Sequence, residues 1–292
     1  GGHISSTDLF HWRHHPTGLL GGMYSGNCFL NGDGIPTMCY HEVDLGNSLA
    51  ISMDDELNQW NKLKSNPITP DDKELEAYKS KSISPRKRGY RSWDPFGWYS
   101  SGNYYAIFGG ESPAVAKASK LNGKWHYVGD LFAHQINGIS LEEDLSCPDL
   151  FRLGGKDVLL CISHRIGCRY YVGEWKNEQY HPENHAQMSW VDNTFFAPDS
   201  LEGGSGRRIM WAWLLDYRDL GARLDQNWSE TLSRPRVLNL GKDGLLEIDV
   251  AQEIESLRYR HSRKTDITIQ SRQKIFIEGI YGSSLELNLK LA

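Results

Sequence analysis

The sequence contains no apolar run near the roughly 20 residues that a membrane-spanning helix requires. It also has no C-x-x-C pair, and its cysteine count is odd, which argues against both a zinc ribbon and a disulfide framework. The five cysteines are Cys28, Cys39, Cys147, Cys161 and Cys168. Reduced thiols are therefore expected, which slightly favours a cytoplasmic location. The chain starts at Gly1 without a Met, so we expect the native N-terminus upstream, where a signal peptide would be.

The chain also lacks a net positive charge. The net charge is -5 and the sequence pI is about 6.1, so no basic field would hold a phosphate backbone. Nucleic acid and membrane partners are not expected, and small or neutral ligands are favoured. His11, His14 and His15 lie close together, but no carboxylate or cysteine stands at ligand spacing beside them. No metal and no cofactor are expected.

Long amphipathic helices are missing as well, whereas glycine turns recur at short intervals. Between the turns lie short apolar or aromatic runs, which predict strands. These runs are Tyr24–Leu30, Tyr104–Phe108, Val158–Ile162, Tyr170–Trp175, Ile209–Leu214 and Leu245–Val250. The pattern predicts an all-β sandwich, barrel or propeller.

A repeated turn distinguishes among these architectures. The stretch from Ser6 to Trp12 is echoed by Ser52 to Trp60, and more weakly by Ser119 to Trp125. Recurrence of such a turn after short strands, at roughly 40 to 50 residues, is typical of the blades of a β-propeller.

The composition changes after Val250. Residues 251–258 predict a helical turn or linker, and the alternating segments 266–270, 274–278 and 284–291 predict strands. We therefore expect a propeller over residues 1–256, and over 257–292 a linker with the first strands of a second, truncated β-domain.

Two acidic turns precede strands, where catalytic carboxylates are often found. The first is Ser92-Trp93-Asp94-Pro95, and the second is the run Glu142-Glu143-Asp144-Leu145-Ser146-Cys147-Pro148-Asp149. We expect both turns to converge on one cavity. A solvated loop is the other interpretation of three consecutive acids.

The chain is rich in tryptophan and tyrosine, with 10 Trp and 14 Tyr. Such flat amphipathic rings pack in sheet cores or stack on sugars. Trp211 and Trp213 share one face of a strand because side chains alternate with period 2. That face is either part of the core or a stacking wall.

These motifs resemble glycoside hydrolase family 32, which comprises invertases, levanases, inulinases and related β-fructosidases. The matching segments are Gly2–Trp12, Tyr24–Asn27, Ser92–Pro95, Cys147–Phe151, Phe195–Pro198, Gly206–Trp213, Arg234–Arg236 and Leu257–Arg258. The resemblance implies a five-bladed propeller, here with an incomplete first blade, followed by a β-sandwich. It also implies that sugar binds in the axial funnel.

The family uses an Asp nucleophile, a stabilising Asp and a Glu general acid/base. The nucleophile motif should lie upstream of Gly1, so this chain would be a fragment without it and inactive alone. Asp94 matches the stabilising acid, although Trp93 replaces the usual Arg before it, and Arg91 is a candidate for that cationic contact. Ser146 occupies the position of the general acid/base, and a hydroxyl group cannot take over that proton transfer.

Asp144 or Glu143 is the candidate replacement for the missing acid. Asp144 lies two residues before Ser146 and so shares its face in an extended strand, whereas Glu143 requires a bulge to reach it. Pro148 is expected to hold Cys147 in extended geometry, with Ser146 facing the axis. A working acid would lie within roughly 5 to 7 Å of Asp94. The alternative is a site that has lost its acid/base.

The resemblance therefore implies a retaining β-fructofuranosidase-like enzyme for the terminal fructofuranosyl units of sucrose or fructans. The expected sugar contacts are Ser25, Asn27, Arg91, Trp93, Ser146, Cys147 and Trp213. Two alternatives stay open: a non-catalytic carbohydrate-binding propeller, and a related five-bladed glycosidase for arabinose- or xylose-type sugars.

Overall fold

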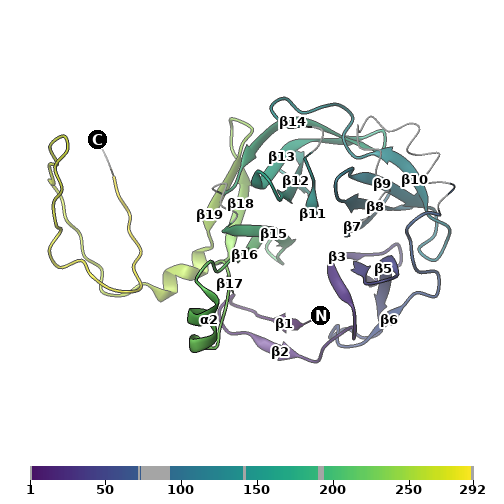
Figure 1. Ribbon diagram of the computed structural model, residues 1–292, viewed down its shortest axis with the longest axis horizontal. Helices are drawn as coiled ribbons and strands as arrows, with labels where there is room; N and C mark the ends of the chain where they lie inside the picture. Colours follow the sequence, from purple (N-terminus) through teal and green to yellow (C-terminus); the bar gives the residue numbers. More distant parts are fainter. Residues whose placement is uncertain (1, 72, 74–92, 141–142, 190–193, 291–292) are drawn as a thin grey trace.

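The computed structural model describes residues 2–71, 73, 93–140, 143–189 and 194–290. Its strands form antiparallel sheets arranged around a ring (Figure 1). The first sheet contains β3 (Met23–Leu30), β4 (Pro36–Glu42), β5 (Gly46–Ser52) and β6 (Trp60–Lys62). The second contains β7 (Trp93–Ser100), β8 (Asn103–Gly109), β9 (Ala114–Ala118) and β10 (His126–Asp130).

The other sheets continue the ring. The third contains β11 (Ser146–Leu153), β12 (Lys156–Ser163), β13 (Gly167–Lys176) and β14 (Gln179–Gln187). The fourth contains β15 (Phe195–Glu202), β16 (Arg208–Leu214), β17 (Thr231–Leu232), β18 (Arg236–Leu240) and β19 (Leu246–Val250). A two-stranded ribbon of β1 (His3–Ser5) and β2 (Arg13–His15) lies between the fourth and first sheets (Figure 1).

This arrangement confirms the predicted β-propeller, with four blades formed by the larger sheets. The strands β3, β7, β11 and β15 lie innermost and surround the axis (Figure 1). The glycine-bounded runs predicted as strands coincide with β3, β8, β12, β13, β16 and β19. The helices in the described part of the chain are short: α2 (Leu220–Gln226) and the 3-10 turn η1 (Gln252–Leu257), which lies at the predicted linker.

The hydrophobic cores lie between neighbouring blades. In β12, Leu159 packs into the core shared with the second blade, whereas Val158 and Leu160 pack into the core shared with the fourth. Alternate side chains of a strand point to opposite faces of its sheet. Both faces of this sheet are covered, so its middle strand is apolar throughout rather than alternating.

The repeated turns have similar hydrogen bonds. The Asp8 carboxylate accepts hydrogen bonds from the backbone N–H of Phe10 at 3.0 Å and of His11 at 2.8 Å. The Asp54 carboxylate accepts from the N–H of Asn58 at 3.1 Å and of Gln59 at 2.8 Å. Each turn thus uses an aspartate to satisfy backbone donors that no strand partner reaches.

Each innermost strand begins with a β-bulge. In three of them a residue with positive φ stands directly before a proline: Asp94 (φ 49°), Cys147 (φ 47°) and Ala197 (φ 45°). The expectation of extended geometry at Cys147 is therefore wrong. The bulge supplies the physical reason, because it inserts a residue that need not follow the ladder and re-aims the adjacent side chain.

The bulge in β3 also explains a glycine. A Cβ at Gly26 would lie 1.9 Å from the Cys39 carbonyl oxygen and 2.6 Å from Tyr40 Cα, so the backbone of β4 would have to move. Gly26→Ala should lower the free energy of unfolding by about 1 to 3 kcal/mol, as overpacking does. Urea denaturation measures this loss. Gly129→Ala in β10 is the control, since nothing lies within 4 Å of its Cβ; an equal loss there would contradict the steric explanation.

Residues 258–290 extend away from the ring as a long loop (Figure 1). No strand is formed in this segment, so the strands predicted over 266–270, 274–278 and 284–290 are wrong for the described residues. Phe276 is 99% exposed and Leu289 71% exposed. A strand needs a hydrogen-bonded neighbour and a surface for its apolar face, and this segment has neither here. The division into two domains stays a prediction.

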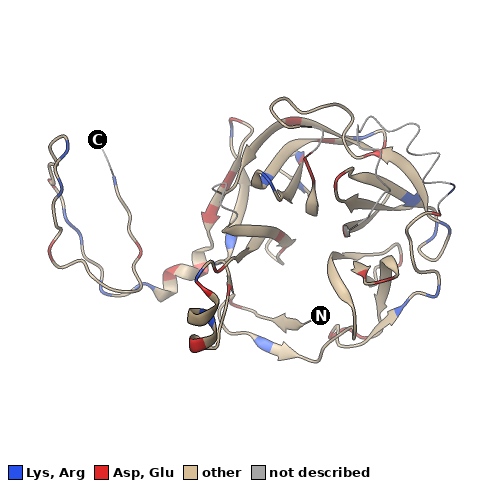
Figure 2. Ribbon diagram, in the orientation of Figure 1, with Lys and Arg blue, Asp and Glu red and all other residues tan. Residues whose placement is uncertain are grey.

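Charged residues of both signs are scattered over the blades and the C-terminal loop (Figure 2). Blue and red positions alternate along the drawn ribbon in this view. Among the described residues, no helix is long and apolar enough to cross a membrane.

Candidate active site

Asp94 meets Cys147 where the innermost strands of the second and third blades begin. One carboxylate oxygen, Oδ2, accepts a hydrogen bond from the Cys147 backbone N–H at 3.3 Å and lies 3.7 Å from its Sγ. The Ser25 hydroxyl on β3 also hydrogen-bonds this thiol. Burial raises the pKa of Cys147, and the charge of Asp94 raises it further, so the thiol stays protonated. Three adjacent blades thus bring three of the predicted site residues together.

Asp144 lies beside Ser146, as the spacing predicted. Its Oδ2 accepts a hydrogen bond from the Ser146 hydroxyl at 3.1 Å and contacts His164 Nδ1 at 2.7 Å. Its Oδ1 accepts from the His164 backbone N–H at 3.0 Å and lies 3.5 Å from the Ser163 hydroxyl. Donors from the start of β11, the end of β12 and the turn that follows β12 thus surround the carboxylate.

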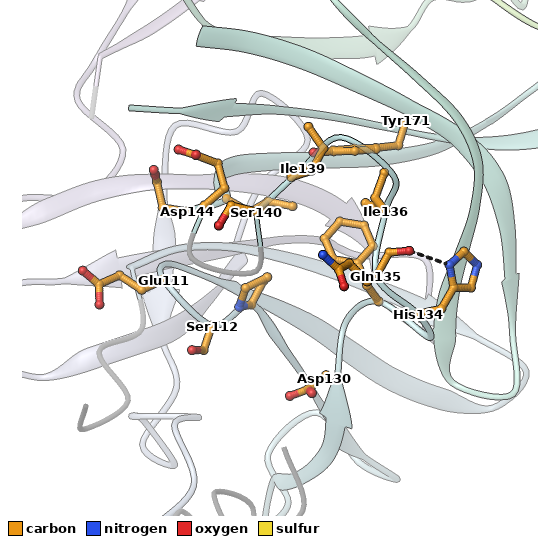
Figure 3. Close-up of a pocket in the computed structure, with 14 residues that line it drawn as sticks. Glu111, Ser112, Asp130, His134, Gln135, Ile136, Ile139, Ser140, Asp144 and Tyr171 are labelled. Carbon is orange, nitrogen blue, oxygen red and sulfur yellow. Dashed lines mark hydrogen bonds between the residues drawn. The ribbon is translucent and has the colours of Figure 1, made fainter. Parts of the chain in front are cut away.

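Glu143 points to the same turn, where its Oε1 accepts a hydrogen bond from the Ser163 hydroxyl at 2.5 Å. Glu143 and Asp144 line a pocket of about 70 Å³. Figure 3 shows Asp144 and Glu111 at one end of this pocket and Ile136 and Tyr171 at the other. The two acids thus have defined partners, and their predicted role next to Asp94 stays a prediction.

Trp213 forms part of an aromatic wall next to these acids. Its ring meets that of Phe196 edge to face, with centroids 6.0 Å apart, and the Trp213 residue is 39% exposed. The His164 ring also meets Phe196 edge to face, with centroids 5.8 Å apart. Trp211, by contrast, packs against Trp12 at 6.1 Å. This strand face was expected to be either core or a stacking wall. The exposure of Trp213 leaves its ring available for stacking.

Asn27 has a structural task. Its Nδ2 donates to the Gly97 carbonyl oxygen at 2.9 Å, and its Oδ1 accepts from the Gly97 N–H at 2.7 Å. The amide thereby joins β3 to β7, and its contact with sugar stays a prediction. Arg91 and the side chain of Trp93 lie outside the part of the chain that the structure describes.

A buried charged cluster was not predicted from the sequence. Asp149, whose side chain is 2% exposed, contacts Arg208 Nη2 at 3.2 Å and accepts a hydrogen bond from the Ser200 hydroxyl at 2.5 Å. Arg208 Nε donates to the same hydroxyl at 2.8 Å. The cluster ties the third blade to the fourth. The signal was available, since Asp149 stands directly before the apolar residues Leu150 and Phe151 in β11, and a charge that is buried there requires a partner.

Burial dominates the electrostatics of this cluster. The pKa of Asp149 is raised to about 7, mainly by burial and then by the neighbouring charge of Asp199, whereas Arg208 and the hydrogen bonds of Ser200 lower it. Asp199 is exposed as a residue. Enough protein nevertheless surrounds its carboxyl group for desolvation to raise its pKa as well. Its charge also reaches the Cys147 thiol. Asp199 is therefore a second carboxyl group of the site that the sequence interpretation missed.

No group of three His, Cys, Asp or Glu residues with the geometry of a metal site occurs within the described ranges. All five cysteines are unpaired, as expected from their spacing. The chemistry that this arrangement offers is therefore that of carboxyl groups, an imidazole and aromatic faces.

The profile of the glycosyl hydrolases family 32 N-terminal domain matches residues 2–248. The chain belongs to this family. The match covers all four blades and the β1–β2 ribbon, and it confirms the resemblance inferred from the motifs.

Among curated relatives, the sucrose-6-phosphate hydrolase of Klebsiella pneumoniae is 27% identical over 241 residues, which cover 73% of this chain and 49% of the relative. That of Bacillus subtilis (strain 168) is 28% identical over 228 residues, covering 65% and 46%. The chain thus spans about half the length of these relatives.

Solved structures show the same fold. Fructan 1-exohydrolase IIa from Cichorium intybus, in complex with 1-kestose, superposes with a TM-score of 0.71 at 20% identity, covering 89% of this chain and 54% of that one. The Bombyx mori β-fructofuranosidase BmSUC1, in a complex with sucrose, gives 0.66 at 21% identity, covering 89% and 57%.

Proposed function

We propose that the full-length protein is a β-fructofuranosidase-like glycoside hydrolase that acts on terminal fructofuranosyl units of sucrose or fructans with retention of configuration. Asp94 stabilises the transition state. Asp144 or Glu143 provides the acid/base function in place of the glutamate usual at Ser146. The propeller has five blades in the full-length protein, and the nucleophile is supplied by the segment before Gly1, so residues 1–292 alone are inactive.

The observation that carries this proposal is the contact of Asp94 with Cys147. It joins the two acidic turns, which are 53 residues apart, at the inner ends of adjacent blades. The aromatic wall at Trp213 supplies a surface on which a sugar ring can stack. The family membership and the sucrose and 1-kestose complexes of structural relatives support the substrate class.

Fructose release from sucrose, inulin and levan by the full-length protein tests the proposal. We expect free fructose, and NMR at early times should show the β-anomer first, as retention requires. Residues 1–292 expressed alone should release none. Hydrolysis of arabinosides or xylosides in place of fructosides would reject the proposed substrate class.

The second candidate is a carbohydrate-binding propeller without turnover. The specific observation in its favour is Ser146, which has a hydroxyl where the family has its acid/base and is only 1% exposed. Calorimetry separates the two functions. Binding of sucrose or a fructan by the full-length protein with no fructose released over a long incubation would favour the binding module.

A further inference from the structure

We propose that His164, oriented by Asp144, is the catalytic group that exchanges the proton with the glycosidic oxygen. This inference rests on the proposed function. It gives the proton exchange to His164 in place of a carboxyl group, and it makes Asp144 the residue that positions the ring. His164 lies in the turn between β12 and β13 and follows Ser163 directly.

The surroundings of Asp144 suit an orienting carboxylate. Both oxygens already accept hydrogen bonds, from the Ser146 hydroxyl on one side and the His164 backbone N–H on the other. Its side chain is only 11% exposed, which leaves little surface for a substrate. The contacts of Asp144 with the Ser146 hydroxyl, the His164 backbone N–H and the imidazole fix its orientation. Asp144 is thus placed to hold another group.

The held group is the imidazole of His164. Because a carboxylate only accepts hydrogen bonds, the 2.7 Å contact requires that Nδ1 carries the hydrogen, which leaves Nε2 as the nitrogen that exchanges protons. A carboxylate that fixes the tautomer and orientation of a histidine is a recurrent device of general acid/base catalysis. The His164 side chain is 60% exposed, so a ligand can reach it.

The position of His164 links the two parts of the site. The His164 ring contacts the aromatic wall: its centroid lies 5.8 Å from that of Phe196, and Phe196 in turn contacts Trp213. On the other side, Asp144 contacts Ser146, and the adjacent Cys147 contacts Asp94. A chain of direct contacts therefore connects the imidazole to the proposed sugar-stacking surface and, through Asp144, Ser146 and Cys147, to the stabilising acid.

The proton transfers balance over two steps. In the first, Nε2–H donates its proton to the glycosidic oxygen as the bond from that oxygen to the anomeric carbon breaks, and the carboxylate nucleophile upstream of Gly1 forms an ester with that carbon. In the second, neutral Nε2 takes a proton from water while the water oxygen bonds to the anomeric carbon and the ester bond breaks. His164 ends protonated and the carboxylate is free.

The test uses His164→Ala in the full-length protein with two substrates that differ in leaving group. Sucrose needs protonation of its leaving oxygen, whereas an aryl β-fructofuranoside with a 4-nitrophenolate leaving group needs little. We expect kcat/KM on sucrose to fall by roughly 10²- to 10⁴-fold, the usual contribution of general acid/base catalysis. The aryl substrate should lose far less, and added imidazole should restore part of the sucrose activity.

Asp144→Asn is the second variant. It should lower kcat on sucrose with little change in KM, and added imidazole should not restore activity, because the ring is still in place. His126→Ala removes an exposed histidine on β10 and should leave both activities unchanged. Urea midpoints of all variants check that folding is intact.

Equal losses of His164→Ala on both substrates, or no effect of imidazole, would overturn the inference. It would also be overturned if Asp199→Asn, rather than His164→Ala, shows the leaving-group difference, because Asp199 would then carry the proton. An active wild-type protein with an unaffected His164→Ala variant rejects this inference alone. A wild-type protein that cleaves no fructoside rejects the proposed function together with it.

Discussion

Full-length protein with Asp94→Asn is expected to hydrolyse its fructoside substrate about 10²- to 10³-fold more slowly than wild type, measured as kcat. The reason is electrostatic: positive charge develops on the sugar ring in the transition state, and a carboxylate that is already fixed in place stabilises it without reorganising. An amide of the same shape lacks the charge. Substrate binding should change less than kcat.

Asn is the suitable replacement because Asp94 has a φ of 49°, in the left-handed region. Asn tolerates that region better than most residues, whereas Ala would add backbone strain to the loss of charge. The matched control is Asp249→Asn on the outermost strand β19, where the side chain is exposed. Wild-type turnover in the Asp94→Asn variant would show that the assigned role is wrong.

Arg208→Met should lower the free energy of unfolding by about 3 to 5 kcal/mol near pH 8, the usual result of leaving a buried charge without its partner. The substitution removes the contact with Asp149 and the hydrogen bond to Ser200. It also removes the stacking of the guanidinium on Phe151, 4.0 Å from the ring centroid. Urea denaturation at several pH values measures the loss.

The pH dependence follows from Asp149. Its pKa in the folded protein is raised to about 7 from an ordinary value of 3.8, so the folded state binds more protons than the unfolded state between these values. Its contribution to stability therefore decreases as pH rises through this window. Arg208 lowers the pKa of Asp149, so without it this pH window extends to higher pH. The free energy of unfolding of the variant should therefore be closest to that of wild type at pH 5 and furthest from it at pH 8.

Arg207→Met is the matched control for this prediction. Arg207 is the preceding residue and also pairs with a carboxylate, Glu253, but the two side chains are 37% and 29% exposed. Such an accessible pair contributes about 0 to 1 kcal/mol. The double variant Arg208→Met with Asp149→Asn should recover part of the loss, because no charge is left buried. Equal losses at 207 and 208 would contradict the role of burial.

Much of the fold was predictable from local patterns. The strands β3, β8 and β12 follow from apolar runs between glycine turns, because strand geometry is set by neighbours in sequence and by turn chemistry. The repeated aspartate turns near Trp12 and Trp60 indicated radial blades. The geometry of Cys147 was not predictable, since the general preference of a residue before proline is overridden by the bulge in β11.

The C-terminal segment shows the opposite limit. The alternation over 266–270 and 284–290 is a strand pattern, yet these residues form no strand here. Alternation says which face of a strand would be apolar. It does not provide the neighbouring strand to which the backbone must bond.

By itself, the sequence determined that this chain is built of short strands in a propeller, that it belongs to its family, and that its acids lie at the mouths of strands. Only the tertiary structure decided which of those groups meet: Asp94 with Cys147, Asp144 with His164, and Asp149 with Arg208. The physical reason is that strand periodicity fixes the face of each side chain within a blade. Asp144 meets His164 through the pairing of β11 with β12 inside the third blade. The other two contacts are between blades and depend on how the sheets close around the axis, which no local pattern encodes.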